Sequence, residues 1–249
     1  MSGHSKWATI KRHKAKMDAA RSSVISKALR DITLAAKHGG GNPDGNLRLK
    51  IAIERARDAN VSLDSINRAI KRGIGEGDGG PIEELTYECY GPGGTAILVE
   101  AATDNRNRTA GEVRYILSKH GGKLAEMGSV AWMFDQKGLI TVEKEGLSED
   151  DALAMAIDAG AEDMETEDDV YEIYTAPADV FEVSQRLAQA GAKIQNAELT
   201  QVPKTTVVLD GEDAAKMVRL LEALEEHDDV SKVHSNFDMS DETAASIPE

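Results

Sequence analysis

Basic side chains surround a single aromatic residue near the start of the sequence. The positions concerned are Lys6, Trp7, Lys11, Arg12, Lys14, Lys16 and Arg21. Lysine and arginine neutralise phosphates and release their counterions, and an indole ring can stack on an exposed base or ribose. The pattern therefore predicts a nucleic-acid-binding arm. In the alternative, Trp7 anchors the arm on the protein core and solvent covers the charges.

A second polar cluster, Thr103 to Thr109, lies where a predicted strand turns into a helix. It contains Arg106, Asn107 and Arg108. Arginine and asparagine donors at a helix N-terminus suit an anion, so these three residues are predicted to contact nucleic acid. The alternative is that Asp104 caps the helix and that the arginines pair with acids of the same domain.

A third group, Lys71 and Arg72, lies on a predicted helix together with Asn67 and Arg68. This helix could read a DNA groove, but the long glycine-rich stretch 37–46 does not have helix-turn-helix spacing. We therefore predict only that Lys71 and Arg72 contact nucleic acid.

The remaining reactive residues give no enzyme motif. The six histidines lack zinc-site spacing, and there is no H-E-x-x-H or G-x-S-x-G. His120 is expected to cap a helix C-terminus, and Cys89 to lie in a core. Glycines at 75, 77 and 80 match G-x-G-x-x-G, but they follow a helix and adjoin acids, so no dinucleotide site is expected. We predict no enzymatic activity, metal, cofactor or small-molecule substrate.

Charge divides the chain in two. Residues 1–75 hold 16 Lys and Arg against 6 Asp and Glu, whereas the whole 249-residue chain has a net charge of −15. The rest therefore carries −25. Such a split favours a nucleic-acid-facing basic module joined to an acidic body. Alternatively, the basic face docks on that acidic body.

Composition narrows the protein class further. A single cysteine excludes a disulfide scaffold. The sequence contains no run of 18 apolar residues, so no transmembrane helix is expected. The basic first residues lack the apolar core of a secretory signal. We expect a cytoplasmic monomer with no membrane partner.

Apolar periodicity predicts helices over 18–38, 46–60 and from Ser62 to Gly73, followed by a glycine linker to residue 81. The 46–60 pattern also resembles a strand, but its Arg, Glu and Ala content favours a helix. A hairpin over 84–90 and 95–102, a helix over 107–119 and a strand over 129–134 come next.

Residues 138–202 have the order βαββαβ of a ferredoxin-like domain. The expected strands are 139–143, 162–166, 170–175 and 194–201, with helices from 149 and over 177–191. Strand 205–209, helix 211–227 and strand 230–236 complete the chain. Because 84–134 and 205–236 each lack a matching half, we predict that one α/β domain is interrupted by the other.

The predicted fold class is α+β with three domains. They are a basic helical domain (1–75), an interrupted α/β domain (82–136 plus 203–238) and the ferredoxin-like insert (137–202). A disordered tail is expected over 239–249.

Several motifs occur in register along nearly the whole chain. They are Gly3-His4-Ser5-Lys6-Trp7, Gly39-Gly40-Gly41-Asn42-Pro43, Ile70-Lys71-Arg72-Gly73, Tyr90-Gly91-Pro92-Gly93-Gly94, the 103–109 cluster and Gly128-Ser129-Val130-Ala131-Trp132-Met133-Phe134. The sequence resembles the YebC family, which includes the mitochondrial translational activator of cytochrome oxidase. Departures are Ser2, Thr9 and Cys89, and none removes a basic residue.

The resemblance implies three domains and no enzymatic activity. Bacterial members are described as probable transcriptional regulators that bind DNA, and others as ribosome-associated factors that help translation through proline runs. A basic arm with one Trp and an acidic body favours RNA, because a ribosome factor needs shape and phosphate complementarity more than base readout. A DNA-binding transcriptional regulator is the alternative. A protein-interaction scaffold is the second alternative.

Overall fold

The structure, a computed structural model, describes residues 21–77 and 80–246. The chain divides into two compact units, a first unit made of Met1–Met133 and Pro203–Glu249, and an inserted unit, Phe134–Val202. The inserted unit begins three residues before the predicted boundary. The basic residues Lys6 to Lys16 lie outside the described ranges.

The helical part of the first unit, residues 21–77, contains three helices around one core. They are α2 (Arg21–Gly39), α3 (Leu47–Asp58) and α4 (Leu63–Gly73), with a 3-10 turn at Pro43–Gly45. Ile32, Leu49 and Ile66 are fully or almost fully buried between them. Ser62 caps α4, since its hydroxyl accepts the Ser65 N–H at 3.2 Å. The expectation of a helical N-terminal region is confirmed, and the ambiguous 46–60 segment is a helix.

The sheet part of the first unit is a four-stranded sheet in the order β3-β1-β2-β9. Its strands are β1 (Glu83–Tyr90), β2 (Ala96–Thr103), β3 (Lys123–Leu124) and β9 (Val230–Ser235). Strand β1 pairs antiparallel with β2, and β2 pairs antiparallel with β9, which follows the inserted unit in the chain. The short strands β8 (Val207–Val208) and β10 (Phe237–Asp238) pair in parallel.

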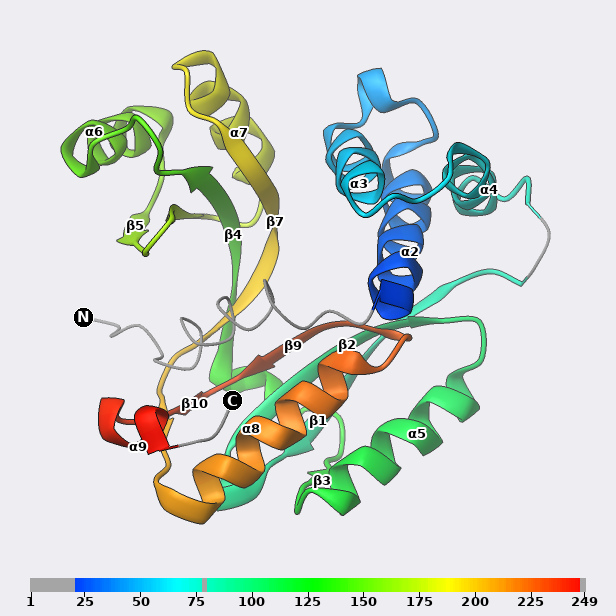
Figure 1. The fold of residues 1–249 in the computed structure, drawn as a ribbon, viewed down its shortest axis with the longest axis vertical. Helices are drawn as coiled ribbons and strands as arrows, with labels where there is room; N and C mark the ends of the chain where they lie inside the picture. The colour runs from blue at the N-terminus through cyan, green and yellow to red at the C-terminus, as the bar shows by residue number, and fades with distance from the viewer. Residues whose placement is uncertain (1–20, 78–79, 247–249) are drawn as a thin grey trace. The chain divides into compact units, whose positions relative to one another are not determined.

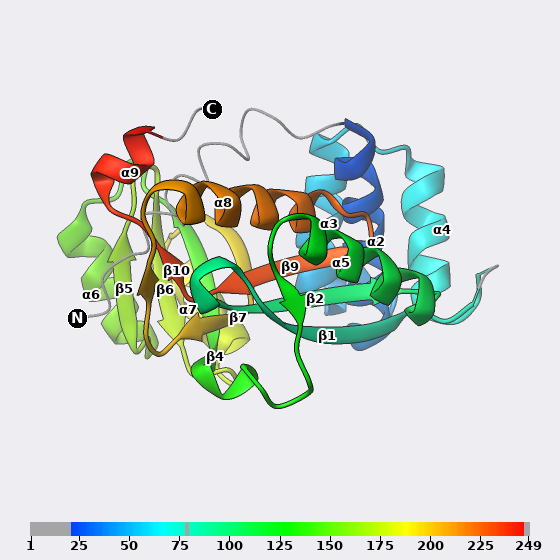
Figure 2. The same ribbon diagram turned by 90° about the horizontal axis from the view of Figure 1, so that it is seen from below.

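Two helices, α5 (Arg106–Lys119) and α8 (Gly211–Glu226), lie side by side over one face of this sheet (Figures 1 and 2). Val113 and Leu117 of α5 share a core with Met217 and Leu220 of α8. This core holds Cys89, which is fully buried, and burial raises the pKa of its thiol to about 12. A thiol this protonated and enclosed is a packing residue, as the sequence predicts.

The inserted unit contains the elements β4 (Phe134–Glu143), α6 (Glu149–Ala159), β5 (Asp163–Thr166), β6 (Val170–Thr175), α7 (Val180–Gln189) and β7 (Ile194–Pro203). Its strand order is β5-β6-β4-β7, and β6 pairs antiparallel with both β4 and β5. Ile140, Ile173 and Leu187 are buried between sheet and helices. The chain is therefore α+β, with a helical N-terminal region and two four-stranded sheets.

Two predicted features are wrong. Residues 129–133 form a turn and a 3-10 helix (Ala131–Met133) instead of a strand. The Glu88 carboxylate, which is buried, accepts the backbone N–H groups of Gly128, Val130 and Ala131 at 2.5, 2.6 and 2.9 Å, so these groups cannot join a ladder. Burial alone would raise the pKa of Glu88, but the hydrogen bonds from these N–H groups have the larger effect. The pKa of Glu88 is therefore lowered.

The disordered tail predicted over 239–249 is corrected for its described part, because α9 spans Asp241–Ser246; residues 247–249 lie outside the described ranges. Thr243 is buried, and its hydroxyl donates to Asp210 Oδ1 at 2.8 Å. Ser240 Oγ accepts the Thr243 N–H at 3.2 Å and so caps the helix. A polar segment is thus ordered by capping and by one buried contact.

Candidate nucleic-acid interface

One face of α2 holds the helical part against the sheet part. Leu34 packs with Ile82 and Ala102 in a small buried cluster. Lys27 donates to the carbonyl of Glu225, and Lys37 donates to Glu84 at 3.2 Å. Lys27, Leu34 and Lys37 lie on one helical face because they are spaced by three or seven residues. Some of the basic surface therefore docks on the acidic part of the same chain, which was one of the alternatives.

Asp229 is the centre of this contact. Its side chain is 5% exposed. Its carboxylate accepts hydrogen bonds from Arg30 Nη2 at 2.8 Å and from Arg108 Nη2 at 2.7 Å. The Thr109 hydroxyl donates to it at 2.7 Å. Burial alone would raise the pKa of Asp229. The hydrogen bonds from Arg108 and Thr109 and the charge of Arg30 have the larger effect, so the pKa of Asp229 is lowered. Asp229 thus stays ionised and links both parts of the first unit.

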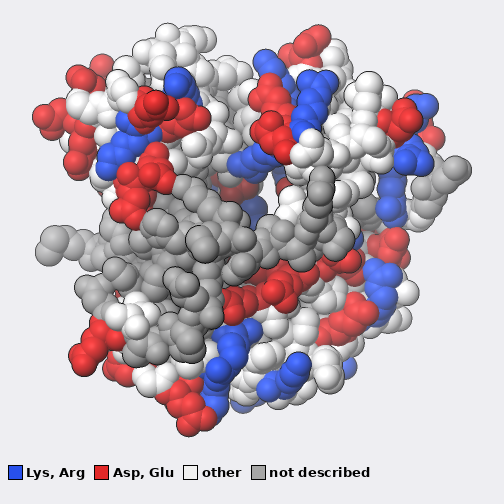
Figure 3. Space-filling model, in the orientation of Figure 1, with Lys and Arg blue, Asp and Glu red and all other residues white. Residues whose placement is uncertain are grey.

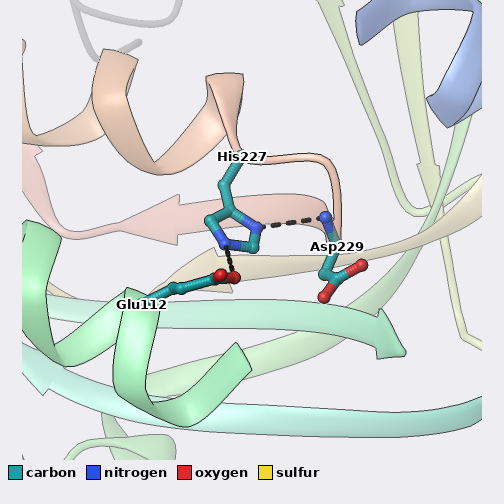
Figure 4. A group of neighbouring side chains, drawn as sticks. All are labelled: Glu112, His227 and Asp229. Atoms are coloured by element: carbon teal, nitrogen blue, oxygen red, sulfur yellow. Dashed lines mark hydrogen bonds and ion pairs between the residues drawn. The ribbon is translucent and has the colours of Figure 1, made fainter. Parts of the chain in front are cut away.

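Glu112, His227 and Asp229 have potential metal-ligand atoms within 4.8 Å of one another (Figure 4). The lone pairs are already used, however. His227 Nδ1 accepts the Asp229 N–H at 3.1 Å, which leaves the Nε2 proton to donate to Glu112 Oε2 at 2.8 Å. The Asp229 carboxylate is held by two guanidinium groups. The cluster therefore suits a structural hydrogen-bond network better than a cation.

A cleft of about 640 Å³ opens in the first unit between α2, α4 and the turn from β2 to α5. Its charged lining has five cations and two acids: Arg30, Arg68, Lys71, Arg72, Arg108, Glu76 and Asp104. The predicted contacts Lys71, Arg72 and Arg108 are thus brought together from two segments over 30 residues apart in sequence. Sequence reasoning missed Arg30, which lies within an amphipathic helix pattern like any solvated arginine.

Two guanidinium nitrogens of the cleft residues are buried without a hydrogen-bond partner, Nη1 of Arg30 and Nε of Arg72. Arg72 also donates through Nη2 to Asp104 Oδ2 at 3.2 Å and to the Gly80 carbonyl at 3.4 Å. Buried donors without a partner are costly, and both nitrogens belong to residues that line the cleft. Phosphate oxygens are strong acceptors for guanidinium groups.

The other predicted body contacts lie outside the cleft lining. Arg106 is exposed, and its Nε lies 3.6 Å from Glu83 Oε2. Asn107 is exposed on the first turn of α5. The helix is capped by Asn105, whose Oδ1 accepts the Arg108 N–H at 3.1 Å, so the alternative that Asp104 is the cap is wrong by one residue. The predicted pairing of the arginines with nearby acids is present.

The basic surface is mixed with acids elsewhere on the helical part. Figure 3 shows Lys and Arg side chains interspersed with Asp and Glu over α3 and α4. Arg21 is the first residue of α2. In the described ranges, no helix is long and apolar enough to span a bilayer.

The fold and the cleft define a multi-domain protein in which a basic helical region meets an acidic α/β region. Residues 5–76 match the family described as "TACO1/YebC protein N-terminal domain", and residues 82–237 match "TACO1/YebC second and third domain". The chain belongs to the TACO1/YebC family.

Relatives and a solved structure match this chain over nearly its full length. A protein of Pelotomaculum thermopropionicum is 54% identical over 97% of this chain and 100% of its own, and one of Dictyoglomus turgidum is 53% identical over 99% and 100%. Both are named "Probable transcriptional regulatory protein". The crystal structure of a conserved hypothetical protein from Aquifex aeolicus is 46% identical, with a TM-score of 0.85, over 95% of this chain and 98% of its own. The relatives are named as regulators, not as enzymes.

Proposed function

We propose that this protein is a non-enzymatic regulator of gene expression that binds ribosome-associated RNA and relieves stalled translation, for example at proline runs. The observation that carries the proposal is the cationic cleft, where Arg30 and Arg72 keep buried donors without protein partners. The basic arm with Lys11, Arg12 and Lys14 would add further phosphate contacts.

The size of the cleft favours a single strand over a duplex. The cationic residues of α4 face Thr103 and Asp104 across the same cleft of about 640 Å³. A DNA major groove is about 12 Å wide and must receive a whole helix about 10 Å in diameter, which requires an open helix face. Small-ligand pockets of about 300–1,000 Å³ hold groups of nucleotide size. Unpaired RNA segments supply such groups, since their backbone and bases are accessible.

The three parts would divide the work. In this proposal the helical domain holds the RNA, and the interrupted α/β domain closes the cleft. The element order βαββαβ supports a ferredoxin-like fold for the insert. The insert stays off the RNA because its surface is acidic. Acidic surfaces repel phosphate and limit wrapping on bulk nucleic acid.

Sedimentation of a cell lysate through sucrose at low and moderate salt tests the proposal. We expect the wild-type protein to travel with ribosomes, and the variant Arg68→Glu/Lys71→Glu to stay at the top. The matched control is Lys50→Glu/Arg57→Glu, which reverses two exposed charges on α3 outside the cleft lining. A second variant, Lys11→Glu/Arg12→Glu/Lys14→Glu, tests the arm. Wild-type protein that stays at the top at both salt concentrations contradicts the ribosomal role.

DNA binding is the second candidate function, because the relatives are named as probable transcriptional regulatory proteins. Asn67 and Arg68 are exposed on α4 and could read base edges if the helical part separated from the sheet part. A genome-wide DNA-binding assay with the Arg68→Glu/Lys71→Glu variant distinguishes the two. Discrete enriched sites that this variant loses would support a transcriptional role.

A further inference from the structure

The turn between β3 and β4 exposes two large apolar side chains. Met127 is 95% exposed and Trp132 is 66% exposed. Single exposed apolar residues are ordinary on a protein surface, but two of this size within six residues concentrate apolar surface in one turn. Trp132 Nε1 donates to the Ser129 carbonyl at 3.0 Å. The indole N–H is thus already bonded, so the exposed part of Trp132 is available for an apolar or stacking contact.

Other parts of the first unit hold this turn in place. The buried carboxylate of Glu88 on β1 accepts the N–H groups of Gly128 and Val130. The Val130 side chain is fully buried. Lys204 Nζ donates to the Trp132 carbonyl at 3.0 Å. Because the backbone is held before a partner arrives, little conformational entropy is lost when one binds.

A second aromatic ring and a cation lie beside the turn. The Tyr90 hydroxyl donates to the same Ser129 carbonyl at 3.4 Å. Tyr90 pairs with Lys123 across β1 and β3, so both side chains leave the same face of the sheet. Lys123 Nζ lies 5.7 Å from the centroid of the Tyr90 ring. Since Cys89 points into the core under α5 and α8, its neighbour Tyr90 points to the opposite face, where Glu88 holds the turn.

A cleft of about 480 Å³ opens beside Tyr90 and Lys123. The rest of its lining is Gly91, Gly94, Gly121 and Gly122. Gly94 and Gly121 have φ of 77° and 79°, which favours glycine, and nothing lies within 4 Å of their Cβ positions. The cleft wall is therefore partly bare backbone, which a ligand can approach closely. Lys123 is exposed, so its ammonium group can contact a phosphate there.

We propose that the turn 125–133 is a stacking contact for single-stranded RNA, in which Trp132 stacks on an unpaired base and Lys123 contacts a phosphate of the same strand. The proposal rests on the proposed function. Aromatic rings beside cations are typical of single-strand sites, because every base has a π-face and every nucleotide a phosphate. The glycine-lined cleft leaves room for sugar and phosphate next to Lys123. A duplex could not use this contact, since its bases are already stacked on one another.

Fluorescence anisotropy with a labelled 20-nucleotide single-stranded RNA, at several salt concentrations, tests the contact in the full-length protein. We expect Trp132→Ala to bind about tenfold more weakly with an unchanged salt slope, because stacking releases no counterions. Trp132→Phe keeps an aromatic ring and should stay within about threefold of wild type. The matched control is Tyr115→Ala, which should bind like wild type. Tyr115 is also 66% exposed, but it lies on α5, which covers the opposite face of the sheet.

Intrinsic fluorescence gives a reading that a merely structural role would not change. The chain has two tryptophans, so Trp7→Phe leaves Trp132 as the only indole. We expect saturating unlabelled RNA to quench its emission, because a stacked base lies against the ring. Unquenched emission at saturation would place Trp132 away from the bases and overturn the proposal. Lys123→Gln should lower the log–log salt slope by about 0.7, the value for one phosphate contact with a single strand.

The two proposals can fail separately. If Trp132→Ala binds RNA as Tyr115→Ala does while Arg68→Glu/Lys71→Glu weakens binding, the stacking contact is refuted and the cleft beside α4 keeps its role. Equal losses for Trp132→Ala and Trp132→Phe would also refute stacking, since the phenylalanine retains a ring. If wild-type protein binds no RNA, both proposals fail. Thermal unfolding of each variant checks that the folds are equally stable.

Discussion

Replacing Asp229 with Asn should destabilise the first unit, because Asp229 is the carboxylate that links α2 to the sheet part. The change keeps the shape of the side chain but removes its charge. It leaves the guanidinium of Arg30, whose side chain is only 18% exposed, without its counter-ion. Arg108 is 46% exposed, so water compensates for most of its loss.

The magnitude follows from this difference in exposure. Removing one partner of a buried ion pair costs about 3–5 kcal/mol, and the remaining Asn oxygen places the value near the lower limit. We therefore expect a loss of about 3 kcal/mol in the free energy of unfolding. For a chain of this size that corresponds to a fall in melting temperature of about 6–12 °C. Arg30→Gln/Asp229→Asn should cost less than the sum of the single changes, since the second change removes the unpaired charge.

The assay is urea unfolding followed by circular dichroism, with hydrogen exchange as a local measurement. The Ala102 N–H donates to the Asp229 carbonyl at 2.8 Å, so its exchange should accelerate in the variant. Asp228→Asn is the matched control, because Asp228 is the exposed neighbour. A free energy of unfolding for Asp229→Asn within about 0.5 kcal/mol of this control would refute the reasoning.

The same prediction has a defined pH dependence. The pKa of Asp229 is lowered in the folded state relative to its ordinary value of 3.8. Its ionised form therefore stabilises the fold fully above about pH 5, and this contribution is lost as the pH falls through the folded-state pKa. The stability difference between wild type and Asp229→Asn should shrink on acidification below pH 4.

Two further predictions concern packing and the turn after β3. Gly73→Ala should destabilise the protein by about 1–3 kcal/mol in thermal unfolding, because its Cβ would lie 2.4 Å from the Thr33 carbonyl oxygen. The control is Gly111→Ala within α5, where nothing lies within 4 Å of the added Cβ, and it should stabilise the protein by about 0.5–1 kcal/mol. If the two substitutions changed the stability equally, the close packing of α2 and α4 would be contradicted. Glu88→Gln should cost about 1.5–3 kcal/mol and speed hydrogen exchange at Val130, because an amide cannot accept three N–H groups as a carboxylate does. Unchanged exchange at Val130 would show that Glu88 does not hold the turn.

The sequence predicted the elements whose pattern is local. Helix α4 follows from apolar spacing and the Ser62 cap, and β1 and β2 follow from alternation across a glycine turn. The strand expected over 129–134 failed because the backbone N–H groups of Val130 and Ala131 donate to Glu88, 42 and 43 residues earlier. That partner has no local signal, since one Glu among 44 acidic residues cannot be distinguished by type.

The candidate site was only partly predictable for the same reason. Lys71, Arg72 and Arg108 were singled out by local clustering, and the fold places them around one cleft. Arg30 and Asp229 form their contact across 199 residues, which no periodicity encodes.

The pairing of β2 with β9 across the inserted unit also has a consequence for the order of folding during synthesis. Thr103 ends β2 and Val230 begins β9, so ribosomes must add over 120 residues before the strand finds its partner. At about 5–20 residues per second, the β2 edge stays open for about 6–25 s. All of Phe134–Val202 emerges in that interval as one contiguous unit. The insert can therefore complete its own sheet while the sheet that surrounds it in sequence is still unfinished.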